Sequence, residues 1–81
     1  MSLTPLKPEF LRTCSKNYDK VTNWKFFIEE RGRGRWTVIG YNNTTGQKFH
    51  VTGEDQMAVV AKVIEYAHSL DSRIVHSHSA V

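Results

Sequence analysis

Arginine and glycine alternate in one short stretch of the chain, Arg31-Gly32-Arg33-Gly34-Arg35. Glycine lets a backbone approach a surface closely, and a guanidinium group forms forked hydrogen bonds with phosphate or with the edge of guanine. Lysine places a positive charge near a phosphate, whereas phenylalanine and tyrosine offer stacking or apolar contacts. The residues that combine these chemistries in and around the stretch are Lys25, Phe27, Arg31, Arg33, Arg35, Tyr41 and Lys48.

Other residue types capable of chemistry lack the spacing of a catalytic or metal site. Cys14 has no histidine nearby in the sequence, and a reactive thiolate needs a specific electropositive environment. Four of the eight acidic residues occur as adjacent pairs, Glu29-Glu30 and Glu54-Asp55, and neighbours on a strand point to opposite faces. His76 and His78 form an H-x-H pair, whereas a structural zinc site normally takes four ligands. We therefore expect a non-enzymatic chain without a cofactor or a metal ion.

Three short runs with period-two alternation lie between Trp24 and Thr52. Successive side chains of a strand point to opposite faces of a sheet, and aromatic and β-branched residues fill these runs. The breaks at residues 31–34 and 42–46 are rich in glycine and asparagine, which tolerate left-handed backbone. The sequence therefore predicts a three-stranded antiparallel meander.

The alternation assigns each strand residue to one of two sheet faces. The apolar set belongs under a helix and consists of Trp24, Phe26, Ile28, Trp36, Val38, Phe49 and Val51. The opposite set mixes basic, aromatic and apolar side chains and consists of Lys25, Phe27, Arg35, Thr37, Ile39, Tyr41, Lys48 and His50. We expect the second face, with the arginines of the adjoining turn, to be the binding surface.

One long helix is predicted after the strands, from a cap at Thr52 to about Leu70. The Thr52 hydroxyl would accept hydrogen bonds from free N–H groups, and the Glu54-Asp55 pair would favour the positive end of the helix dipole. The apolar stripe of this helix is wider than one sheet face usually covers. We expect the amino-terminal segment or a second copy of the chain to cover the remainder.

The segments before and after the predicted strands and helix lack a clear side-chain periodicity. Residues 1–23 are expected to pack on the domain or to be partly flexible, with Pro8 at the first position of a short helix. Residues 24–70 form the predicted core of three strands and a helix. Residues 71–81 lack an evident cap and are predicted to be a flexible tail.

Length and composition favour a single small α+β domain. The chain has 81 residues, a formal charge of +3 and one cysteine, so no disulfide can form within it. A core this small is only marginally stable unless it is shared between subunits, so a homodimer is one expectation. No apolar run is long enough for a membrane span or a signal peptide, and we expect a cytoplasmic location.

The order of three strands and one helix, with an aromatic residue at the start of the second strand, is similar to the architecture of plant AP2-type DNA-binding domains. It is also similar to that of integrase arm-binding domains. The likeness spans about Trp24 to Leu70 and rests on pattern, so it implies a fold but carries no residue roles.

Two functions from different classes fit the basic and aromatic sheet face. Nucleic-acid binding, most readily of DNA, is the first expectation, and a protein interaction module using the same face is the alternative. The location of charge separates them. Convergence of Lys25, Lys48 and the three arginines on one surface would favour nucleic acid, whereas interruption by Glu29 and Glu30 would favour a protein partner.

Overall fold

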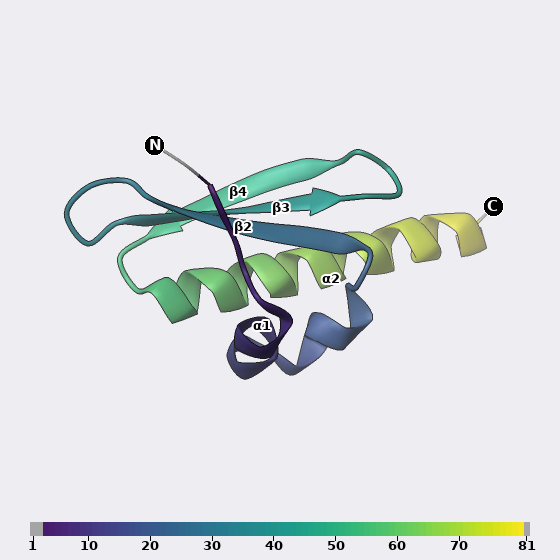
Figure 1. Cartoon of the computed structure of the whole chain (residues 1–81). Coiled ribbons are helices and arrows are strands. Elements are labelled where there is room, and N and C mark those ends of the chain that lie inside the picture. The colour runs from purple at the N-terminus through teal and green to yellow at the C-terminus, as the bar shows by residue number, and fades with distance from the viewer. Residues whose placement is uncertain (1–2, 81) are drawn as a thin grey trace.

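The computed structural model describes the backbone of residues 3–80 and the side chains of residues 3–71. The fold is α+β, with an antiparallel sheet packed on a long C-terminal helix (Figure 1). The sheet has the order β1-β2-β3-β4, with β1 at Thr4–Pro5, β2 at Trp24–Glu30, β3 at Trp36–Asn42 and β4 at Lys48–Gly53. The helices are α1 at Pro8–Cys14, the 3₁₀ helix η1 at Lys16–Lys20, and α2 at Gln56–Ala80.

The sheet has four strands, so the prediction of three is wrong. The additional strand β1 pairs antiparallel with β2, placing Thr4 opposite Ile28 and Pro5 opposite Phe27. Two residues are too few to show period-two alternation, and Pro5 has no N–H group for a ladder. Proline is nevertheless compatible with an edge strand, which is where β1 lies.

The core lies between the sheet and α2, and the predicted apolar face is confirmed. Trp24, Phe26, Ile28 and Val38 are buried, while Trp36, Phe49 and Val51 are partly buried and pack against them. The helix contributes the buried residues Val59, Val60, Val63, Ile64 and Ala67. Gly40 leaves space for the ring of Phe49, because a Cβ at Gly40 would lie only 3.0 Å from that ring.

The start of α2 is set by Asp55 rather than by Thr52. The Asp55 carboxylate accepts a hydrogen bond from the Ala58 N–H at 3.2 Å, as expected of a residue directly before the helix. Thr52 belongs to β4, and its hydroxyl lies 2.8 Å from that of Thr37 on the neighbouring strand. The predicted cap is therefore wrong, because Thr52 stays in the sheet and α2 begins only at Gln56.

The predicted end of α2 near Leu70 is also wrong, because the helix continues to Ala80. No glycine or proline interrupts residues 71–80, so the helical backbone has no strong local reason to stop. Asp71 joins the helix to the sheet by accepting a hydrogen bond from the Trp24 indole at 3.1 Å. The flexibility of residues 71–81 stays a prediction, and the side chains of His76 and His78 lie outside the described residues.

The amino-terminal segment packs against α2, on the same side of the sheet (Figure 1). Leu11 of α1 and Val21 after η1 are buried in the core. The connection between α1 and η1 is held to α2 by Glu65, whose carboxylate accepts hydrogen bonds from the Ser15 hydroxyl and from the Asn17 amide. The two Asn17 contacts are 2.8 and 2.9 Å long.

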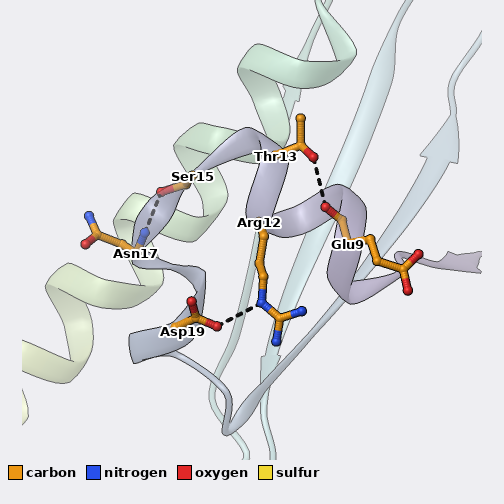
Figure 2. A network of polar contacts seen from close by, with 6 residues as sticks. All are labelled: Glu9, Arg12, Thr13, Ser15, Asn17 and Asp19. Carbon is orange, nitrogen blue, oxygen red and sulfur yellow. Dashed lines mark hydrogen bonds and ion pairs between the residues drawn. The ribbon is translucent and has the colours of Figure 1, made fainter.

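A local polar network shapes this segment, as Figure 2 shows. The Arg12 guanidinium donates to the Asp19 carboxylate at 3.0 Å and lies 5.5 Å from the centre of the Tyr18 ring. The Thr13 hydroxyl donates to the Glu9 carbonyl oxygen one turn earlier. The contacts of Arg12 join α1 to η1, whereas the Thr13 contact lies within α1.

Candidate functional site

The sheet face away from α2 is called the open face here, because no element of the described chain covers it (Figure 1). In an antiparallel sheet, residues directly opposite one another share a face. The register places Lys25 of β2 opposite Tyr41 of β3, and Tyr41 opposite Lys48 of β4. These three side chains are exposed and form one row across the sheet, which we call the basic row.

Neither lysine of the basic row belongs to an ion pair within the described side chains, residues 3–71. Two strand spacings separate Lys25 from Lys48, which is about 10 Å. Two cations at this distance on an exposed surface attract an anion with repeated charges. The tyrosine between them is 37 % exposed and presents an aromatic ring beside the charges.

The next row on the open face is largely apolar. Phe27 lies opposite Ile39, which lies opposite His50, and Pro5 of β1 lies on the other side of Phe27. Phe27 and Ile39 are half-buried, whereas His50 is exposed. The basic row therefore has an apolar surface directly beside it, formed by Pro5, Phe27 and Ile39.

The third row contains an acidic residue. Glu29 lies opposite Thr37, and the Glu29 side chain is only 16 % exposed. The Glu29 carboxylate is 3.6 Å from the Arg31 guanidinium, so the first arginine of the turn is partly neutralised. Glu30 is on the other face of β2, since it lies opposite Trp36.

The arginine-rich turn lies at the far end of the sheet from the basic row. Arg31 follows Lys25 by six positions, which corresponds to roughly 20 Å along a strand. The turn is closed by a hydrogen bond from the Arg31 N–H to the Arg35 carbonyl oxygen at 2.8 Å. Gly32 and Gly34 adopt φ values of 110° and 64°, a conformation that favours glycine.

The candidate contact residues therefore separate into two groups. Lys25, Phe27, Tyr41 and Lys48 lie together at one end of the open face, and Arg31, Arg33 and Arg35 are exposed in the turn at the other end. Arg35 precedes β3, so its assignment to the sheet face is wrong. Glu29 lies between the two groups, so the five basic residues do not converge on one surface.

The sequence did not single out Thr22 and Asn43, which lie beside the basic row and line a notch at the edge of β2. Both residues are in loops that precede or follow strands, where no periodicity marks them. They approach each other because Asn43 donates its backbone N–H to the Asn23 carbonyl oxygen at 2.9 Å. Only the pairing of β2 with β3 brings these two loops together.

Catalytic and metal chemistry finds little support in the described part of the chain. Burial raises the pKa of the Cys14 thiol, which lowers its thiolate fraction and its reactivity. Among the side chains of residues 3–71, no three histidine, cysteine or acidic residues gather as metal ligands would.

No protein-family model, curated protein or solved structure matches the chain. None of the helices in the described residues is long and apolar enough to cross a membrane.

Proposed function

We propose that the chain is a non-enzymatic domain that binds single-stranded nucleic acid across the end of its open face. The observation that carries this proposal is the basic row, in which Lys25 and Lys48 flank Tyr41. The lysines would meet two phosphates of the strand, and Tyr41 would stack on a base. Phe27 and Ile39 of the apolar row would support the neighbouring base.

The shape of the surface favours a single strand over a duplex. The three strands that carry the basic row span about 10 Å between backbones, and their own width adds to this. The major groove of DNA is about 12 Å wide and admits a helix or a two-stranded ribbon. An unpaired strand has no such limit, and its bases can lie flat on aromatic side chains.

The charge of the surface sets the expected strength of binding. Each phosphate contact with a single strand contributes a slope of about −0.7 to the dependence of log K on log salt concentration. Two lysine contacts therefore predict a slope of about −1.4 and a modest affinity. The arginine turn is outside this contact set, because it is roughly 20 Å away and Arg31 is paired with Glu29.

The test compares two variants that lose the same charge at different places. Binding of a labelled 12-nucleotide single strand is measured by fluorescence anisotropy at several salt concentrations. We expect the double variant Lys25→Ala/Lys48→Ala to lose most of the salt dependence, a change in slope of about 1.4. The matched variant Arg33→Ala/Arg35→Ala should keep a slope close to that of the wild type.

Equal effects of the two variants would show that only net charge matters, which contradicts a local site. Absence of binding at low salt by folded wild-type protein would remove nucleic acid as the ligand. A duplex of the same length is included as a comparison. Tighter binding of the duplex than of the single strand would overturn the preference for unpaired bases.

A second candidate function is association with another chain through β4. The outer edge of β4 has no strand partner within the described residues, and Phe49, Val51 and Tyr66 are partly exposed beside it. An unpaired edge with apolar neighbours readily accepts another strand. By the criterion of charge location, Glu29 between the two groups of basic residues favours a protein partner. The nucleic-acid proposal is therefore limited to the basic row, which contains no acidic residue.

The proposed partner at this edge is a second copy of the chain. Sedimentation equilibrium across a wide concentration range distinguishes the 9.3 kDa monomer from a species of twice that mass. A monomer at every concentration would remove the homodimer.

A further inference from the structure

A notch of about 410 Å³ opens at the outer edge of β2, directly beside the basic row. Strand β1 pairs with β2 only at Phe27 and Ile28, so the beginning of β2 has no strand on its outer side. Leu11 of α1, Tyr18 of η1 and the chain next to these two helices line the notch at this gap. Lys25 and Phe27 belong both to the open face and to the lining of the notch.

We propose that the notch holds one base of the bound strand, turned off the open face over the edge of β2. This inference rests on the proposed function, since it needs a single strand on the basic row. It adds a contact that the flat face cannot provide, namely enclosure of one base on several sides.

The walls of the notch suit the faces of a base. Leu11 and Phe26 are buried, and Leu6 and Tyr18 are half-buried, so the interior is apolar. The half-buried Tyr18 ring packs on the buried Phe26 ring, with centroids 6.2 Å apart and planes inclined by 58°, so Tyr18 is the aromatic side chain of this pair that keeps exposed surface at the notch. The faces of a base are apolar and stack well on aromatic rings.

The rim of the notch suits the edges of a base. Thr22 and Asn43 are exposed there, and their side chains carry a hydroxyl and an amide. The Asn43 amide group makes no hydrogen bond to the described side chains or backbone of residues 3–71. It therefore has a donor and an acceptor available for the polar edge of a base.

The positive charge of Lys25 and the volume of the notch both fit a single nucleotide. Lys25 lines the notch and belongs to the basic row, so its long, positively charged side chain can meet the phosphate of the same nucleotide. The volume is near the lower limit of about 300–1,000 Å³ for small-ligand sites, which leaves room for about one nucleotide. The notch is thus too small for a folded peptide segment.

The test uses a variant whose larger side chain fills the notch. It measures whether the resulting loss of binding affinity depends on the presence of a base. Thr22→Phe places a ring at the exposed rim, and Thr44→Phe adds the same bulk at an exposed turn residue that does not line the notch. The ligands are a 12-nucleotide single strand and an abasic strand of the same length and charge. Circular dichroism establishes that each variant is folded.

We expect Thr22→Phe to weaken binding of the normal strand about fivefold or more, the effect of losing one stacking contact. Its binding of the abasic strand should match that of the wild type. Thr44→Phe should bind both strands like the wild type. Asn43→Ala provides a second variant, with a smaller loss that is again confined to the normal strand.

The outcomes separate this inference from the proposed function. Normal binding of both strands by Thr22→Phe and Asn43→Ala would overturn the notch as a base site and leave the basic row intact. An equal loss on both strands would overturn it as well, because the effect would not depend on a base. Absence of wild-type binding to the normal strand would overturn both proposals together.

Discussion

Replacement of Gly53 by alanine tests how tightly the end of β4 packs on the start of α2. Gly53 is the last residue of β4, and a Cβ at this position would lie 2.6 Å from the Cγ2 atom of Val59. Carbon atoms in good contact are about 3.5–4.0 Å apart, so one of the two elements must move by about 1 Å. Val59 is buried and β-branched on a helix, which leaves its side chain little freedom to turn away.

Two effects of opposite sign determine how the Gly53→Ala substitution changes the free energy of unfolding. Overpacking of a core by one methyl group costs about 1–3 kcal/mol. Gly53 does not have a left-handed backbone, so alanine also restricts the unfolded chain and stabilises by about 0.4–1 kcal/mol. The packing cost is larger, and we expect a net loss of about 0.5–2 kcal/mol.

Urea unfolding followed by tryptophan fluorescence measures this loss. For a domain of this size, each 1 kcal/mol also lowers Tm by roughly 4–8 °C. The control is a double-mutant cycle with Val59→Ala, which removes the conflicting methyl group. In the Val59→Ala background the packing cost is absent, so Gly53→Ala should stabilise by about 0.4–1 kcal/mol. An equal cost in both backgrounds would refute the contact as the cause.

Two further predictions concern the segments that hold the sheet in place. Hydrogen bonds from Ser15 and Asn17 lower the pKa of Glu65 in the folded state, so their stabilisation is complete above the ordinary pKa of about 4.3 and is lost as pH falls through the lowered value. The urea midpoint of the wild type should therefore fall more steeply below about pH 5 than that of Glu65→Gln, and parallel curves would contradict this. Asn42→Ala should lose about 1–3 kcal/mol in urea unfolding, because the buried Asn42 side chain accepts hydrogen bonds from two backbone N–H groups of the β3–β4 turn at 2.8 and 3.2 Å. An unchanged urea midpoint in Asn42→Ala would show that water replaces those bonds at no cost.

The alternation of side chains was sufficient to predict β2, β3 and β4 and the apolar face under α2. The alternation is a local pattern, because it compares the polarity of each residue only with that of its neighbours in the sequence. β1 could not be predicted in this way, because it is two residues long and exists only by pairing with Phe27 and Ile28. The cap at Asp55 was missed for a related reason, since the end of β4 depends on its pairing with β3.

The candidate site shows the same limit more sharply. The sequence identified Lys25, Tyr41 and Lys48 as residues of one face, but only the register shows that they form a single row. The turn from Arg31 to Arg35 had the strongest local pattern, yet the same register places it at the opposite end of the sheet. Which basic residues act together is decided by pairing between strands, and residue types alone do not contain that information.

The two lateral edges of the sheet differ in a way that limits assembly. On one side β1 is two residues long, and its Pro5 lacks a backbone donor; on the other side β4 offers six residues. If two copies joined through β4, the long edge of each would be occupied, and only the short edge at β1 and β2 would be left for further growth. A sheet with two equivalent edges would instead add subunits without limit, as fibrils do. Pro5 thus withholds one backbone donor from the short edge, which disfavours addition of a strand at that position.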